Sequence, residues 1–237
     1  MRRIGACWFA FMAVLSAGCI AEDLTLIVFQ NQQAEEGCVI PSGVEAAFLS
    51  AGLLDLSGER GYVVSPVLQN GASVDETSPN QNVVLVSGAD VELRVASTAR
   101  SIEVVTMLAA MQQHLRTHYF SASIMGGGSA GVAFPAIDVD QVRVLRDLLG
   151  DESVPLVARI EVFGVIDGSR DVRTPPFDYP ITVCEGCLVE DLGACNAIDR
   201  EVVIKQGGAC NIFQDQPVSC CDNGDMRVCP APPPAIM

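Results

Sequence analysis

Short apolar runs separated by turn residues make up most of this chain. The runs with the length and β-branched content of strands cover residues 24–29, 61–68, 82–87, 91–96, 156–166 and 178–183. Gly, Pro, Asn and Asp between such runs are typical of turns between strands. Asp167-Gly168 predicts a hairpin after the fifth run, and Gly88-Ala89-Asp90 predicts a turn between the third and the fourth.

One segment, residues 138–149, has the pattern of a capped amphipathic helix. Asp138 and Gln141 stand at the two positions of a capping box, and Gly150 follows as a stop. The apolar positions between them recur at helical spacing. Many strands and one helix predict a mainly β fold, which we expect to be an immunoglobulin-like antiparallel β-sandwich with one short helix.

The first residues of the chain have the layout of a signal peptide. Arg2 and Arg3 precede an apolar run over residues 4–18, and Glu22 and Asp23 end the apolar character soon after it. This run is shorter than the roughly 20 apolar residues that a membrane-spanning helix needs. We therefore expect export followed by cleavage, without a permanent membrane span.

The end of this segment resembles a bacterial lipoprotein signal. Leu15-Ser16-Ala17-Gly18-Cys19 places two small residues directly before a cysteine, although Ser16 stands where an aliphatic residue is usual. The resemblance implies that Cys19 receives a diacylglyceryl group and becomes the first residue after cleavage. It also implies that Ile20 directs the protein to the outer membrane. Cleavage after Ala21 by an ordinary signal peptidase is the alternative.

The charge of the chain limits its partners. Cleavage before Cys19 leaves 219 of the 237 residues and takes the formal net charge from −15 to −17, because Arg2 and Arg3 are removed. A surface this acidic repels nucleic-acid phosphates and anionic lipid headgroups. We expect no nucleic-acid binding, and attachment to the membrane must come from the lipid.

Eight cysteines follow Cys19, an even number that predicts up to four disulfides in an exported protein. Seven of them lie within the last 54 residues and cannot all pair with one another. If every thiol is oxidised within the chain, Cys38 bridges to this tail. Cys220 and Cys221 are adjacent and are expected to reach different partners. The eight candidates are Cys38, Cys184, Cys187, Cys195, Cys210, Cys220, Cys221 and Cys229.

The clustering of the cysteines divides the chain into three regions. Residues 1–18 are the expected signal peptide, and residues 19–183 are the expected β-sandwich domain. Residues 184–237 form a small disulfide-rich C-terminal appendage with a Pro-rich tail. From Pro230 onward we expect an exposed polyproline II segment.

Two motifs resemble a catalytic and a metal site, and we expect neither to act as one. Gly127-Gly128-Ser129-Ala130-Gly131 has the spacing of a hydrolase nucleophile, but an extended segment follows it and both histidines precede it. A glycine loop between strands is favoured. His114 and His118 would face one metal if residues 104–119 formed a helix, yet no third ligand is near and the residues from Thr117 look extended.

Cys184-Glu185-Gly186-Cys187 follows a predicted strand and precedes the leucine-containing segment 188–192. This order superficially resembles the strand, C-x-x-C and helix arrangement of thioredoxin-like proteins. Glu185 places negative charge beside the thiols, which disfavours a reactive thiolate. We favour a structural bridge here.

The layout of the whole chain resembles predicted bacterial lipoproteins with a β-rich body, a cysteine-rich C-terminus and no assigned activity. The resemblance implies no catalytic residue, no metal and no cofactor. We predict a non-enzymatic, lipid-anchored module of the bacterial cell envelope, at the outer membrane, which acts in binding or envelope structure. Its partners would be the membrane, through the lipid, and an envelope protein. The alternative is an exported thiol-disulfide redox or metal-binding protein that uses Cys184 and Cys187. The oligomeric state stays open.

Overall fold

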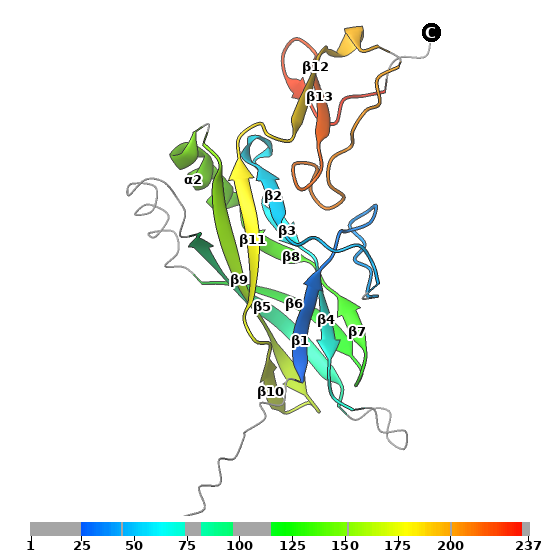
Figure 1. Ribbon diagram of the computed structural model, residues 1–237, viewed down its shortest axis with the longest axis vertical. Helices are drawn as coiled ribbons and strands as arrows, with labels where there is room; N and C mark the ends of the chain where they lie inside the picture. The colour runs from blue at the N-terminus through cyan, green and yellow to red at the C-terminus, as the bar shows by residue number, and fades with distance from the viewer. Residues whose placement is uncertain are drawn as a thin grey trace, which may run out of the picture.

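A long, mostly antiparallel sheet forms the body of the molecule (Figure 1). The computed structural model describes residues 25–43, 45–73, 82–96, 115–150, 152–199 and 201–233. The strand order in this sheet is β2 (Gly52–Asp55), β11 (Phe177–Cys184), β9 (Val154–Ile166), β5 (Val84–Val95) and β6 (Arg116–Ile124), with β10 (Arg170–Arg173) paired to β9. Only the β2–β11 pair is parallel among these strands.

Shorter strands lie against one face of this body sheet. They are β1 (Leu26–Asn31), β4 (Pro66–Asn70) and β7 (Ser129–Gly131), which form a three-stranded sheet, and the pair β3 (Tyr62–Val64) and β8 (Phe134–Ile137). A single apolar core lies between the layers, with Leu26 and Leu68 on one side and Val84 and Ile160 on the other.

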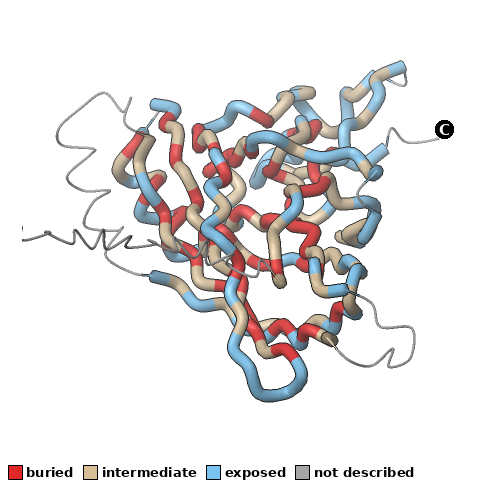
Figure 2. Tube along the Cα trace, turned by 60° about the horizontal axis from the view of Figure 1, so that its bottom comes forward, coloured by how far each residue is buried: buried red, intermediate tan, exposed pale blue. Residues whose placement is uncertain are grey.

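Alternation along the strands explains this burial. The thirteen residues of β9 alternate strictly between buried and half-buried, as a strand does when one face is in the core and the other is outside. The same alternation is visible along the tube in Figure 2. The outer face of the body sheet is therefore left available for solvent or a partner.

Helix α2 (Val139–Leu149) is the one α-helix among the described residues. The Asp138 backbone N–H donates to Oε1 of Gln141 at 2.8 Å, which is the second half of a capping box. Leu145 and Leu149 are buried on its inner face, and the chain leaves the helix at Gly150 with φ 51°. The predicted helix, its cap and its stop are confirmed.

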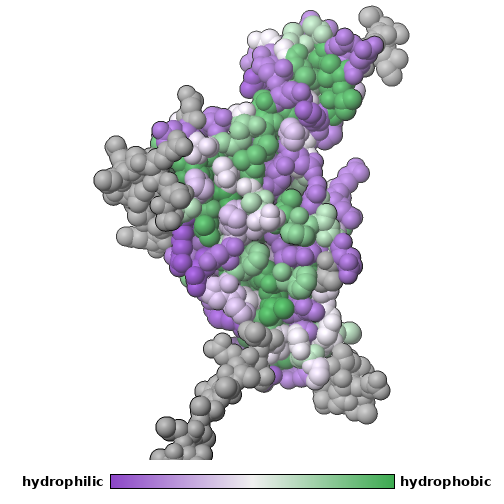
Figure 3. Space-filling model, viewed as in Figure 1, coloured by the Kyte–Doolittle hydropathy of each residue, from purple (hydrophilic) through white to green (hydrophobic). Residues whose placement is uncertain are grey.

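A small lobe forms the C-terminal end of the chain, above the body in Figure 1. It contains β12 (Val189–Ala194), the 3-10 turn η2 (Cys195–Ala197), β13 (Val218–Asp222) and β14 (Arg227–Val228). Its own core is minor and consists of Phe213, Val218 and Cys220. Figure 3 shows apolar and hydrophilic side chains gathered in separate patches on this lobe.

The chain between β12 and β13 returns to the body and pairs with its edge strand β2. The Asp55 N–H donates to the Phe213 carbonyl at 2.9 Å, and the Asp215 N–H donates to the Leu53 carbonyl at 2.8 Å. Leu54 and Gln214 form the isolated bridge between these two bonds. The C-terminal region is therefore docked onto the body sheet as an added strand segment.

Four disulfides hold this arrangement. The pairs are Cys38–Cys210, Cys184–Cys187, Cys195–Cys221 and Cys220–Cys229. The first joins the N-terminal part of the body to the tail, as the odd cysteine count of the tail requires. Cys220 and Cys221 reach different partners, as expected.

The mainly β class is confirmed, and the immunoglobulin-like arrangement stays a prediction. The hairpin at Asp167-Gly168 is also confirmed, because the Ser169 N–H donates to the Ile166 carbonyl and β10 pairs back onto β9. The predicted turn at Gly88-Ala89-Asp90 is wrong. Residues 84–95 form one strand, and the glycine marks a register shift between Val86 and Gly88 instead of a reversal.

The expected exposed tail is also wrong at its beginning. Ala231 is buried, and its N–H donates to the Ser219 carbonyl at 2.6 Å. The first residues after Cys229 therefore pack onto the lobe, because the backbone finds a hydrogen-bond partner there that an isolated polyproline II segment lacks.

The disulfide that closes the longest loop should contribute most to stability. We expect the double variant C38S/C210S to lose about 5 kcal/mol of unfolding free energy, because in the chain-entropy model the cost scales with loop length. The matched variant C195S/C221S should lose about 3.5 kcal/mol by the same relation, since its sequence separation is 26 against 172. Urea denaturation of the two variants measures both losses. An equal loss in the two variants would contradict the loop-length argument.

Candidate functional site

The outer face of the body sheet carries a row of four residues from four neighbouring strands. Tyr119 of β6 pairs with Gly88 of β5, Gly88 pairs with Phe163 of β9, and Phe163 pairs with Arg173 of β10. Tyr119 is 81% exposed, the highest value among the large hydrophobic side chains described. Sequence-distant residues are thus brought into one line by strand register.

Ring contacts organise this row. The rings of Tyr119 and Phe163 meet edge to face, with centroids 6.3 Å apart and planes at 81°. The Arg173 guanidinium carbon lies 5.1 Å from the centroid of the Phe163 ring. Both arrangements are favourable for an aromatic quadrupole, and each contributes about 0.5–1.5 kcal/mol at most at a partly exposed site. Phe163 is therefore held between an aromatic edge and a cation.

Gly88 makes room for the Phe163 ring. A Cβ atom at position 88 would overlap both this ring and the His118 carbonyl oxygen. The ring therefore lies over bare backbone, which fixes its position on the sheet.

Asp90 ties Arg173 to the sheet. Its carboxylate accepts a hydrogen bond from Arg173 at 2.8 Å and one from the Thr117 hydroxyl at 2.7 Å. Burial pushes the pKa of Asp90 upward, but the bonds from Arg173 and Thr117 outweigh it, so this pKa lies below its ordinary value. Asp90 stays ionised at neutral pH and neutralises the guanidinium. We call Tyr119, Phe163, Arg173, Asp90 and Thr117 the outer-face patch.

A second candidate lies where the tail meets the body. A small polar pocket there encloses about 20 Å³, which is room for about one water molecule. Its lining residues are Asn31, Gln32, Gln33, Ala34, Leu49, Val63, Ser65, Gly208, Ala209, Gln214, Asp215 and Gln216. Oε1 of Gln32 is buried and has no hydrogen-bond partner within the described residues. The pocket fits a bridging water and is too small for an organic substrate.

Asp215, which lines this pocket, also forms a partly buried hydrogen-bond network. Its Oδ1 accepts the Leu53 N–H at 2.8 Å, and its Oδ2 accepts the Tyr62 hydroxyl at 2.9 Å. The Tyr62 and Tyr179 hydroxyls lie 3.2 Å apart. Burial raises the pKa of Asp215 above its ordinary value and raises that of Tyr179 to about 12. These groups hold the tail in place and have no open space for a substrate.

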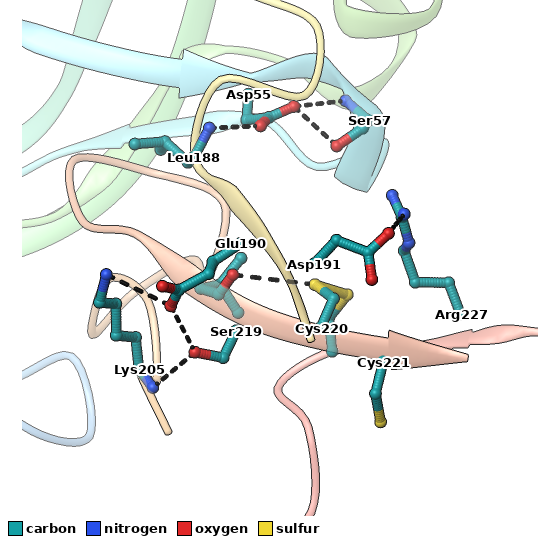
Figure 4. Close-up of a disulfide and its surroundings, with 12 residues drawn as sticks. Asp55, Ser57, Leu188, Glu190, Asp191, Lys205, Ser219, Cys220, Cys221 and Arg227 are labelled. Carbon is teal, nitrogen blue, oxygen red and sulfur yellow. Dashed lines mark hydrogen bonds and ion pairs between the residues drawn. A yellow bond between two sulfur atoms is a disulfide. The ribbon is translucent and has the colours of Figure 1, made fainter. Parts of the chain in front are cut away.

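The C-x-x-C motif is a disulfide loop built around Asp55. The Asp55 carboxylate accepts the Leu188 N–H at 2.8 Å and the Ser57 hydroxyl at 2.7 Å (Figure 4). It also accepts the Gly186 N–H at 2.8 Å. Four donors around one fully buried carboxylate satisfy its charge without a cation. The loop is thus an anchor between lobe and body.

The order of elements around this motif differs from the thioredoxin-like one. The residues after Cys187 lead into strand β12 and not into a helix whose N-terminus would face the sulfurs. Cys184 is buried and Cys187 is exposed. Val189 and Glu190 pair with β13, so the segment after the motif is a strand and the superficial resemblance ends there.

The other sequence candidates are not brought together. Ser129 lies in β7, where its hydroxyl donates to the Ser42 carbonyl at 2.7 Å. His118 lies in β6 and stacks on Phe134 with ring centroids 6.3 Å apart. His114 and Cys19 lie outside the described residues. Within the part of the chain that the structure describes, no three His, Cys, Asp or Glu side chains are grouped to hold a metal ion.

Residues 223–226 connect β13 to β14, and the Asn223 N–H donates to the Met226 carbonyl at 3.2 Å. No helix in the described ranges is long and apolar enough to cross a membrane.

No protein-family model matches the chain, and no curated protein matches it significantly.

The raised pKa of Asp215 predicts a specific dependence of stability on pH. The folded protein holds this proton more tightly than the unfolded chain, whose pKa is near 3.8. The stabilisation linked to this proton is complete below pH 3.8 and is lost as the pH rises through the folded-state pKa. We expect the stability of the wild type relative to D215N to fall as the pH rises from about 4 to 7. Denaturation curves at several pH values measure this difference, and parallel pH profiles would contradict it.

Proposed function

We propose that this protein is an exported, lipid-anchored binding module that holds a protein partner on the outer-face patch. The observation that carries the proposal is the exposed ring of Tyr119, fixed edge to face on Phe163 beside Arg173. Tyr and Arg are among the residues that most often dominate the energy of protein interfaces. The described residues offer no comparable set of catalytic groups.

The rigidity of the patch supports this proposal. Its side chains come from paired strands of one sheet and contact one another, so little side-chain entropy is lost when a partner binds. Asp90 already neutralises Arg173, with 2.8 Å between their bonded atoms. The opposite charges of Arg173 and Asp90 therefore cancel within the patch, although the whole chain has a formal net charge of −15. Long-range repulsion of an acidic partner acts less strongly there.

The membrane part of the proposal rests on the sequence. A thioether-linked diacylglyceryl group on Cys19, with an acyl chain on its amine, would supply the hydrophobic area for stable attachment. The acidic chain lacks the basic surface that would bind anionic headgroups by charge. We place the protein at the outer membrane of the bacterial envelope, without enzymatic activity of its own.

Lipidation predicts a defined mature N-terminus. We expect mass spectrometry of the protein from its native envelope to find Cys19 as an acylated first residue. The variant C19A should move from the detergent phase to the aqueous phase in detergent partitioning, because each buried methylene contributes about 0.8 kcal/mol of membrane affinity. An unmodified N-terminus at Glu22 would show ordinary cleavage and remove the anchor from the proposal.

The binding proposal predicts that single patch residues control capture of one partner. We expect the acylated protein to recover an envelope protein in pull-down. The variants Y119S and R173A should each weaken binding by at least about 30-fold, the effect of losing a hot-spot side chain. V203S is the matched control, because Val203 is 80% exposed and lies on the lobe. Equal recovery by Y119S, R173A and V203S would place binding elsewhere.

A further inference from the structure

Strand β6 is an open edge of the body sheet. Within the described residues it pairs with β5 along one side, and no other described strand pairs with its second side. In an antiparallel pair, alternate residues direct their N–H and C=O groups away from the partner. β6 (Arg116–Ile124) thus presents a row of backbone donors and acceptors up to its last residue, Ile124, whose carbonyl accepts the Asn70 side-chain amide at 3.0 Å.

The other edges of this sheet are protected, whereas no segment among the described residues covers β6. The edge of β2 is covered by Phe213 and Asp215, through the two backbone bonds described above. Strand β10 is short and carries three charged residues in four positions. Natural sheets block edges with charges, prolines, short strands or covering segments. From Thr117 to Ile124 the β6 sequence is Thr-His-Tyr-Phe-Ser-Ala-Ser-Ile, without Asp, Glu, Lys, Arg or Pro.

This sequence is suited to pairing with itself. In a two-fold antiparallel pair centred on Phe120, Tyr119 faces Ser121 and Thr117 faces Ser123 of the other copy. No carboxylates oppose each other, although the whole chain has 29 acidic residues. Two copies of so acidic a protein can approach closely only along a segment that lacks these charges.

The inner side of β6 also favours a second strand. The rings of Phe120 and Phe134 stack with centroids 5.0 Å apart, and Phe120 is only half-buried at the edge of the core. A second copy of Phe120 beside it would cover this apolar surface. Pairing therefore satisfies backbone groups and buries an aromatic pair at the same time.

We propose that β6 pairs antiparallel with β6 of a second copy of this chain, which joins two body sheets into one continuous sheet. The Tyr119 side chain alternates away from the core, so both outer-face patches then lie on the same face of the joined sheet. A partner with two matching sites would bind with higher apparent affinity through the two patches. The pairing itself does not depend on the binding function.

Photo-crosslinking in the native membrane tests the pairing directly. A photoreactive residue in place of Ser121, in the full chain, should give a covalent product of twice the protein's mass, with both crosslinked peptides from residues 116–124. The same group in place of Ser169, in the exposed turn before β10, should give none. The absence of a product of twice the protein's mass at position 121 would overturn the proposal, whether or not a second product with the partner of the outer-face patch forms.

A charge at the same position gives a second measurement. We expect the full-length S121K to be monomeric by light scattering at a concentration at which the wild type is dimeric, because a charge on an edge strand opposes pairing. S169K adds the same charge and should stay dimeric, and circular dichroism checks that both are folded. A monomeric wild type, or a dimeric S121K, would refute the pairing. R173A separates the two proposals, since it should lose the partner and keep the dimer.

Discussion

The pairing of the C-terminal chain with strand β2 is the interaction on which the rest of the structure depends. Two backbone bonds join Asp55 to Phe213 and Asp215 to Leu53, and both aspartates also use their side chains. The Asp55 carboxylate holds the loop that leads into the lobe, and the Asp215 carboxylate receives Leu53 and Tyr62. Without this joint, β2 would be an uncovered edge and two carboxylates would lose the donors that permit their burial.

The Cys38–Cys210 disulfide strengthens the same pairing between the C-terminal chain and the body. Cys210 comes directly before the paired segment, and its bond to Cys38 ties that segment to the N-terminal part of the body. The lobe has few apolar residues of its own in its core. Small units of this kind rely on covalent links because they cannot bury enough apolar surface. Hydrophobic burial therefore stabilises the body, whereas disulfides and hydrogen-bonded carboxylates stabilise the tail.

Local signals explain which parts of this structure were predictable. Asp138, Gln141 and Gly150 act within a few residues of one another, so the helix between them was correctly predicted, and so was the hairpin at Asp167-Gly168. Cysteine parity is a global count, and it correctly required Cys38 to bond with the tail. The errors came from tertiary pairing. Gly88 was expected to turn the chain, yet β6 and β9 bond on both sides of it and keep it extended.

The outer-face patch was missed for the same reason. Tyr119 is 44 residues before Phe163 in the sequence, and only strand register brings it beside the pair of Phe163 and Arg173. If residues 117–124 are assumed to form a strand, their alternation predicts that Tyr119 points away from the core. Nothing in the local sequence shows which side chains lie beside Tyr119. The same limit applies to the long-range partners of Asp55 and Asp215, which are set by the fold, whereas Ser57 and Gln214 are local partners.

The position of the chain's first described residues connects the anchor to the rest of the molecule. Strand β1 starts at the end of the body near β10, and the lobe lies at the opposite end (Figure 1). Cys19 precedes Thr25 by six residues, which span at most about 20 Å even when fully extended. A lipid on Cys19 would therefore hold the β10 end close to the membrane and direct the lobe away from it. The outer face of the sheet, which runs between these ends, would then be reachable from the side, where a partner bound to the same membrane can meet it.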